Sequence, residues 1–281
     1  MKIKATLLSL TILLFFAFFS CKTDKKKADE SNDIVYDTIS VSEVYHIDND
    51  STKPFCSLDI HYVYPTEYSD KEILAAVQSE LNYVLLEDER YEKMNPREAV
   101  DKYVVDYIDH YKRDVEEQFP EWEKSGEAED YFSYRKTLNS ELKYSKGGLI
   151  SYQMVSTDDK GGANSSKFSR NIVVDLETGN TVNEKDIFLP NYKDALNTLL
   201  VSKIMRQNNV TNVEDLVAYG YIGVEDLTSN NNFFVDDKGI TYVFNPGDYS
   251  IFTLEIRVFI PYAEIKSMLR EDSPISNLAG L

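Results

Sequence analysis

The apolar residues of this chain recur with two different periods, and the order of these periods is what most constrains the fold. Residues 54–65, PFCSLDIHYVYP, alternate apolar and polar side chains, which is typical of a half-buried strand. Two helical patterns follow, and strand-like segments dominate from about residue 131. Because strands and helices do not alternate regularly, the sequence predicts an α+β protein with largely antiparallel sheets, packed with amphipathic helices in two adjoining small domains.

Both helical patterns begin with recognisable caps. Ser69 precedes the first pattern, with Glu72 three residues later, and Asn95 precedes the second, with Pro96 at its first position and Glu98 completing the cap. We expect the apolar faces of both helices to pack against a sheet. These faces consist of Ile73, Leu74, Val77, Leu81, Val84 and Leu85 in the first helix, and of Val100, Tyr103, Val104, Tyr107, Ile108, Tyr111 and Val115 in the second.

Turn signals divide the rest of the chain. Pro120 predicts the end of the second helix, and residues 131–147, 149–157 and 167–180 read as successive antiparallel strands with turns at Gly147-Gly148 and at 177–180. The stretch NYKDALNTLLVSKIM returns to a helical period. A hairpin is predicted around Asp237-Lys238-Gly239, followed by a strand over FTLEIRVFIP and a short closing helix over YAEIKSML.

The first residues resemble the signal peptide of a bacterial lipoprotein. Lys2 and Lys4 precede an apolar run over 5–19, which is too short for a membrane-spanning helix, and Ser20 stands directly before Cys21 as in a lipobox. We expect lipidation at Cys21; an ordinary signal peptide with a chance cysteine is the alternative. The predicted parts are a signal peptide (1–20), a tether (21–40) and two α+β domains (41–140 and 141–281). The basic residues after Cys21 favour the periplasmic side of a membrane, to which the lipid would anchor the chain.

The net charge of the chain restricts the classes of molecule that it is expected to bind. The formal net charge is −18, and loss of residues 1–20 would take away two lysines and bring it to −20. Such a chain repels nucleic acid, so nucleic acid is not an expected partner, whereas a cationic protein of the cell envelope is compatible with the charge. Solubility alone is an alternative reason for the same charge. Cys56 is the only other cysteine, so with Cys21 acylated the fold must be held by its core.

The residues of known catalytic and metal-binding patterns do not gather in this sequence. The three histidines, His46, His61 and His110, are scattered, and neither a C-x-x-C nor a G-x-S-x-G motif is present. Asp106 and His110 are four residues apart, which we interpret as a helix-surface contact. We therefore predict no catalytic residue, no metal site and no cofactor. A hydrolase built on two of the many carboxylates stays open as an alternative.

The loop TDDKGGANSS, residues 157–166, carries a glycine pair between two predicted strands. A phosphate-binding loop would lead into a helix, but the residues after this pair are strand-like, and Asp158 and Asp159 would repel a phosphate. The local pattern therefore indicates a turn in which glycine permits a positive φ.

Two longer segments resemble a known family. KGGANSSKFSRNIVVDLETGNTVNEKDIF, together with NNNFFVDDKGITYVFNPGDYS and LEIRVFIPYAEIKSML, is similar to the C-terminal domain family of RsiV, a lysozyme-sensing anti-sigma factor. The same domain occurs in the peptidoglycan deacetylase PdaC, and residues 40–140 resemble the PdaC-type domain that precedes it. The resemblance covers nearly all of the expected mature chain and implies an extracytoplasmic binding part, without anti-sigma or deacetylase modules. Asn164 stands where many relatives have histidine.

What the resemblance implies is a non-enzymatic envelope lipoprotein that binds lysozyme or a similar cationic muramidase, as a sensor or an inhibitor. The expected ligand-binding residues lie in two loops of the C-terminal half: Asp158, Asp159, Gly161, Gly162, Asn164, Asn245, Asp248 and Tyr249. A second hypothesis is a peptidoglycan-binding or other glycan-binding accessory module that uses Tyr242 and Tyr249 as sugar platforms. Thr38 and Ser51 lie in triplets that resemble acceptors for O-glycosylation.

Overall fold

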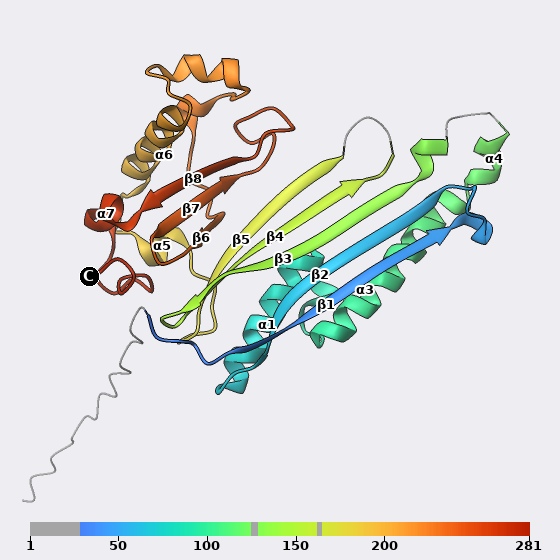
Figure 1. Ribbon diagram of the computed structural model, residues 1–281, viewed down its shortest axis with the longest axis horizontal. Helices are drawn as coiled ribbons and strands as arrows, with labels where there is room; N and C mark the ends of the chain where they lie inside the picture. Colours follow the sequence, from blue (N-terminus) through green and yellow to red (C-terminus); the bar gives the residue numbers. More distant parts are fainter. Residues whose placement is uncertain (1–28, 125–128, 162–164) are drawn as a thin grey trace, which may run out of the picture.

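The computed structural model describes residues 29–124, 129–161 and 165–281, which form two sheets (Figure 1). The larger sheet has the strand order β1-β2-β3-β4-β5 and the smaller one the order β6-β7-β8. Among the pairs that these strands form, only β2 and β3 run parallel, so the predicted α+β class with largely antiparallel sheets is confirmed. The strands are β1 (Val35–His46), β2 (Phe55–Glu67), β3 (Tyr134–Lys146), β4 (Leu149–Asp159), β5 (Ser166–Asp175), β6 (Phe233–Val235), β7 (Gly239–Phe244) and β8 (Ile256–Pro261).

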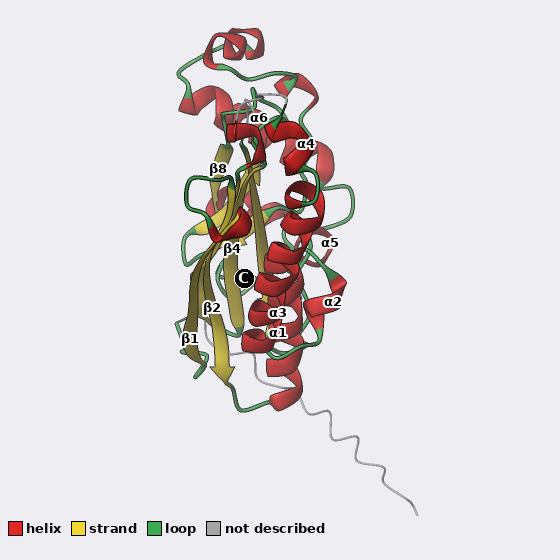
Figure 2. Ribbon diagram, turned by 90° about the vertical axis from the view of Figure 1, so that its right-hand side faces the viewer, coloured by secondary structure: helices red, strands yellow, loops and turns green. Residues whose placement is uncertain are grey.

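Helices make the long connection between the parallel strands β2 and β3. Parallel neighbours need such a crossover, because a tight hairpin can join only antiparallel strands. The crossover consists of α1 (Lys71–Leu86), α2 (Glu89–Glu92), α3 (Pro96–Tyr111), a π-helical turn (Lys112–Glu116), α4 (Phe119–Glu123) and a 3-10 turn (Glu129–Phe132). Figure 2 shows that α1 and α3 lie on the same side of the five-stranded sheet.

The helix ends differ from the sequence prediction in two places. The cap of α1 is Asp70 instead of Ser69, since its carboxylate accepts hydrogen bonds from the backbone N–H groups of Glu72 and Ile73 at 2.9 and 3.1 Å. Asn95 caps α3 as predicted. The α-helical part ends at Tyr111, and Pro120 lies in the first turn of α4, where proline is tolerated because the N–H that it lacks would have no acceptor within the helix.

The first core lies between the larger sheet and its helices. The expected stripes of α1 and α3 are largely buried there, against Leu58 and Ile60 of β2 and Tyr152 of β4. This core also includes Val174 of β5, so it extends well past residue 140. The predicted domain boundary between 140 and 141 falls inside β3, which continues to pair with β4, and β1 takes in the last residues of the predicted tether.

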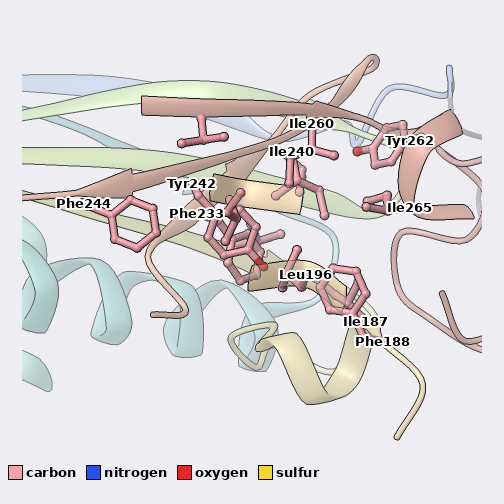
Figure 3. Packing of buried hydrophobic residues seen from close by; sticks show 14 of the residues in the cluster. Ile187, Phe188, Leu196, Phe233, Ile240, Tyr242, Phe244, Ile260, Tyr262 and Ile265 are labelled. Atoms are coloured by element: carbon pink, nitrogen blue, oxygen red, sulfur yellow. The ribbon is translucent and has the colours of Figure 1, made fainter. Parts of the chain in front are cut away.

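The second core lies around the smaller sheet (Figure 3). The helices of this part are α5 (Glu184–Ile187), α6 (Lys193–Gln207) and α7 (Tyr262–Ile265). Leu196 of α6 and Phe188 meet Phe233, Tyr242 and Ile260 of the sheet in one apolar cluster. The predicted hairpin, the helix over 191–205 and the closing helix are therefore all present, and the hairpin turn is held by the Asp236 carboxylate, which accepts from the N–H groups of residues 238 and 239.

Two asparagine side chains join the smaller sheet to the free edge of β5. The Asn245 amide accepts from the Ser169 N–H at 2.6 Å and donates to the Ser169 carbonyl at 3.1 Å. The Asn232 amide accepts from the Asn171 N–H at 2.7 Å and donates to the same Ser169 carbonyl at 2.9 Å. These amides supply to β5 the hydrogen bonds that a sixth strand would make.

We predict that Asn245→Ala destabilises the protein by about 1–3 kcal/mol, because it leaves the buried Ser169 N–H without an acceptor. The free energy of unfolding in urea measures this change. The matched control is Asn139→Ala, since Asn139 is exposed on β3; its effect should stay within about 0.5 kcal/mol. Equal effects of the two variants would contradict the role assigned to Asn245.

Candidate functional site

The structure separates the two aspartates of the predicted binding loop. Neighbouring residues of a strand point to opposite faces, and Asp158 and Asp159 both belong to β4. Asp158 lies on the face covered by helices, with its carboxylate 3.8 Å from the Lys136 ammonium. Asp159 lies on the other face, 3.7 Å from the Arg135 guanidinium. The two carboxylates therefore do not form one binding surface.

The glycine at the end of β4 is required by a close approach of the backbone. Gly161 has φ +76°, and a Cβ atom there would lie 2.3 Å from the carbonyl oxygen of Tyr131. This agrees with the interpretation of Gly161 as a turn residue. Gly162 and Asn164, the other residues predicted for this loop, lie outside the described residues.

The second set of predicted residues lies in the loop between β7 and β8. Asn245 is buried in the joint with β5, and Asp248 accepts the Asn245 N–H at 2.8 Å. Tyr249 is half-buried, and its hydroxyl accepts the Thr228 N–H at 3.1 Å. Tyr242 was expected to be an exposed sugar platform, but this is wrong, because its ring points into the second core and is fully buried (Figure 3).

Beside Tyr249, five large apolar side chains are exposed on two segments, namely a 3-10 helix (Val213–Tyr219) with the loop that follows it, and the loop between β7 and β8. We call these residues the loop tip: Val217 (69% exposed), Tyr219 (55%), Ile222 (57%), Ile251 (47%) and Phe252 (86%). Exposed apolar side chains that gather on adjacent segments are characteristic of interaction sites.

Backbone hydrogen bonds hold the two loops side by side. The Ile222 N–H donates to the Tyr249 carbonyl at 2.8 Å, and the Ile251 N–H donates to the Gly220 carbonyl at 2.9 Å. The strand predicted from Phe252 onward consequently starts only at Ile256, because residues 251–254 turn toward the other loop. Phe252 thus belongs to the loop tip instead of an apolar strand face.

The surroundings of the loop tip are acidic. Residues 207–256 contain eight carboxylates and a single basic residue, Lys238. Five exposed carboxylates lie in or next to the two loops, and none of them takes part in an ion pair with another described residue: Glu214, Asp215, Glu225, Asp226 and Asp248.

The side chains of Cys56, His110 and Asp106, which could act as nucleophiles or metal ligands, are either buried in the core or paired with neighbouring residues. The Cys56 thiol is buried, and its burial raises its pKa to about 11, as expected for a core cysteine. His110 pairs with Asp114 at 2.8 Å, while Asp106 pairs with Lys102 at 3.0 Å. Within the described residues no group of three or more metal-ligating side chains comes together.

The predicted modification sites have different outcomes. Cys21 lies outside the described residues. Thr38, on β1, and Ser51, in the turn that follows β1, are both exposed, and their O-glycosylation stays a prediction. In the part of the chain that the structure describes, no helix has the length and apolar character needed to cross a bilayer.

Fold and loops together define an α+β protein in which a small sheet with exposed loops is attached to the edge of a larger one. Residues 185–264, which contain α6 and the smaller sheet, match the family described as "Protein of unknown function (DUF3298)". The chain therefore carries a DUF3298 domain. No curated protein matches the chain.

Two solved structures extend the comparison. A member of the DUF3298 family from Bacteroides fragilis is 27% identical, with a TM-score of 0.84 over 90% of this chain and 100% of its own. A DUF3298 family protein from Pseudomonas aeruginosa is 12% identical, with a TM-score of 0.59 over 85% of this chain and 96% of its own, which shows the fold alone. The similarity to the first structure thus includes both sheets.

A partly buried carboxylate, that of Glu255, stands directly before β8, and its side chain is 11% exposed. Burial by itself would raise the pKa of Glu255, but hydrogen bonds from the Ser169 hydroxyl and from Arg257, together with the charge of Lys167, lower it below its ordinary value of 4.5. A lowered pKa in the folded state means that this carboxylate stabilises the fold above its unfolded pKa, and that the contribution is lost as the pH falls through the folded value.

We predict that Glu255→Gln lowers the free energy of unfolding by roughly 1–2 kcal/mol at neutral pH, because the charged hydrogen bonds become neutral ones. The difference from the natural chain should shrink as the pH falls below 4.5. Urea unfolding at neutral and acidic pH tests this, with Glu141→Gln, an exposed residue of β3, as the control. A gap that stays constant with pH would contradict the assignment.

Proposed function

We propose that this protein is a non-enzymatic lipoprotein of the cell envelope that binds a cationic protein, with lysozyme or a similar muramidase as the specific candidate. The observation that carries this proposal is the loop tip, in which five exposed apolar side chains are flanked along the chain by exposed carboxylates. An exposed apolar cluster favours contact with a protein surface, and the charge around it selects a basic one.

The two features of the loop tip have separate effects on binding. Burial of Phe252 and Ile222 against a partner supplies affinity that salt does not screen. The surrounding carboxylates speed the encounter with a basic partner, and this effect weakens as salt is added. A second copy of this acidic chain, an anionic membrane and nucleic acid would all be repelled at the same surface.

Placing the binding surface at the loop tip changes which of the residues predicted from the sequence are expected to bind the ligand. Asp248 and Tyr249 lie three and two residues before Ile251 in the second loop, so this half of the predicted set is adjacent to the proposed surface. Asp158 and Asp159 lie on the two faces of β4, in the larger sheet, and take no part in it. The proposed role needs no cofactor and no catalytic group.

Phe252→Ser is predicted to weaken the binding of a c-type lysozyme at least tenfold, or about 1.4 kcal/mol, because it removes the most exposed ring of the loop tip. Calorimetric titration of residues 22–281 with lysozyme, at low and at physiological salt, measures the affinity. The natural chain should keep binding at physiological salt, since the apolar contact persists.

Val44→Ser is the matched control, because Val44 is an apolar residue 55% exposed on β1, away from the loop tip. Its binding should equal that of the natural chain. Heat that disappears with salt, or an equal loss in both variants, would contradict docking at the loop tip. An assay of muramidase activity in the presence of the protein then distinguishes an inhibitor from a sensor.

Cys21→Ser is predicted to move the protein from the membrane fraction to the soluble fraction of cells, because the lipid is the proposed attachment. Fractionation followed by immunoblotting measures the distribution, and Cys56→Ser serves as the control cysteine variant. Membrane association that persists after replacement of Cys21 would rule out the lipid anchor.

A further inference from the structure

A cleft of about 410 Å³ opens on the helix-covered side of the larger sheet. Its floor contains Lys136 of β3 and Asp158 of β4, and Glu87, directly after α1, lies at its edge. Tyr103 and Tyr107 of α3 and Tyr134 of β3 contribute its walls. We call it the tyrosine cleft. It lies in the larger sheet and its helices, apart from the loop tip.

The ammonium group of Lys136 lies between two carboxylates without touching either of them. Its Nζ atom is 3.9 Å from Glu87 Oε2 and 3.8 Å from Asp158 Oδ2, and both distances are too long for a hydrogen bond. The Lys136 side chain is 14% exposed and that of Asp158 is 28% exposed. A hydroxyl group in the cleft could therefore accept from the ammonium and donate to a carboxylate at the same time.

Two further oxygen atoms beside these groups have no partner. Tyr107 Oη and Asp158 Oδ1 are buried and make no hydrogen bond to any described residue. Buried polar atoms are nearly always paired, so two such atoms next to one cleft need an explanation. A rotation of the Asp158 carboxylate, which the broad χ2 preference of aspartate allows, would exchange its buried oxygen with the exposed one.

The walls of the cleft are aromatic. The rings of Tyr103 and Tyr107 are nearly parallel, with an interplanar angle of 13° and centroids 6.5 Å apart. The ring of Tyr91 meets Tyr103 edge to face, at 5.5 Å. Tyr134 stands across from them on β3, with the Lys160 ammonium 5.8 Å from its ring centroid. Such rings pack against apolar C–H surfaces, and the Tyr91 hydroxyl is already paired, donating to Asp106 at 2.8 Å.

From this arrangement we infer that the tyrosine cleft binds a neutral saccharide. A sugar hydroxyl supplies the donor and acceptor that Lys136 and Asp158 lack, and the C–H face of a sugar ring fits the tyrosine walls. The cleft is lined by five carboxylates and four lysine or arginine side chains, so a strongly charged ligand of either sign gains little from it. The inference does not depend on the binding of a cationic protein at the loop tip.

The test uses the full chain, solubilised in a detergent without sugar groups, and a panel of soluble neutral oligosaccharides that includes chitotriose, cellotriose and maltotriose. Calorimetric titration should detect binding of at least one of them with a Kd of about 1 mM or below. Inorganic phosphate and succinate are titrated in parallel. Binding of these anions without any of the sugars would overturn the proposal, and so would the absence of all binding.

Two conservative variants locate the site. Asp158→Asn removes the charge and one acceptor, and Tyr107→Phe removes only a hydroxyl group that has no partner in the free protein. Each should weaken the bound sugar about tenfold or more. Tyr107→Phe should leave the melting temperature unchanged or raise it, because it relieves an unpaired buried oxygen.

Tyr152→Phe is the matched control. The Tyr152 hydroxyl is also buried without a partner, but it belongs to the first core and does not line the cleft. This variant should bind the sugar as the natural chain does. Equal affinity in all three variants, with a sugar still bound, would place the saccharide elsewhere and overturn the assignment of the cleft.

Discussion

The pairing of two asparagine amides with the edge of β5 determines how the two halves of this molecule are arranged. A five-stranded sheet would otherwise leave backbone groups of its last strand unpaired. Asn232 and Asn245 satisfy them from the smaller sheet, and Ser151 of β4 adds a hydrogen bond to the Val235 N–H at 3.1 Å. Because Asn245 also begins the loop that leads to Ile251 and Phe252, the interaction that joins the sheets also sets the position of the loop tip.

Local rules accounted for the elements of the fold better than for its side-chain positions. The helix cap at Asn95, the hairpin turn at Asp237-Lys238-Gly239 and the turn at Gly147-Gly148, with φ of 63° and 83°, are determined by neighbouring residues, so the sequence identified them. The choice of Asp70 over Ser69 depends on the exact path of the chain into α1. Tyr242 was misplaced because strand alternation tells which residues share a face but not which face a second layer covers.

The candidate sites also could not be predicted from the sequence, because they depend on which distant residues the fold brings together. Asp158 and Asp159 are neighbours in the sequence, and the period of the strand sends them to opposite faces. Conversely, Ile222 and Tyr249 lie 27 positions apart and are brought together only by the backbone hydrogen bonds between their two segments. The one signal available beforehand was the near absence of lysine and arginine over 207–256. The tyrosine cleft left no such signal, since its residues come from α1, α2, α3, β3 and β4 and from the turns beside them.

The strand order affects where the loop tip would lie relative to a membrane if the chain were anchored through Cys21. The proposed lipid at Cys21 precedes β1, whereas the smaller sheet is attached to β5 at the opposite edge (Figure 1). Four strand spacings separate the two edges by roughly 19 Å. Residues 30 and 31 already pair with the turn between β3 and β4, where the Gly147 N–H donates to the Glu30 carbonyl at 2.8 Å. A fully extended chain from Cys21 to Glu30 spans at most about 32 Å, so a bound partner would stay within reach of the membrane. If Cys21 carries the proposed lipid, the short stretch between Cys21 and Glu30 would limit the distance between the loop tip and the membrane.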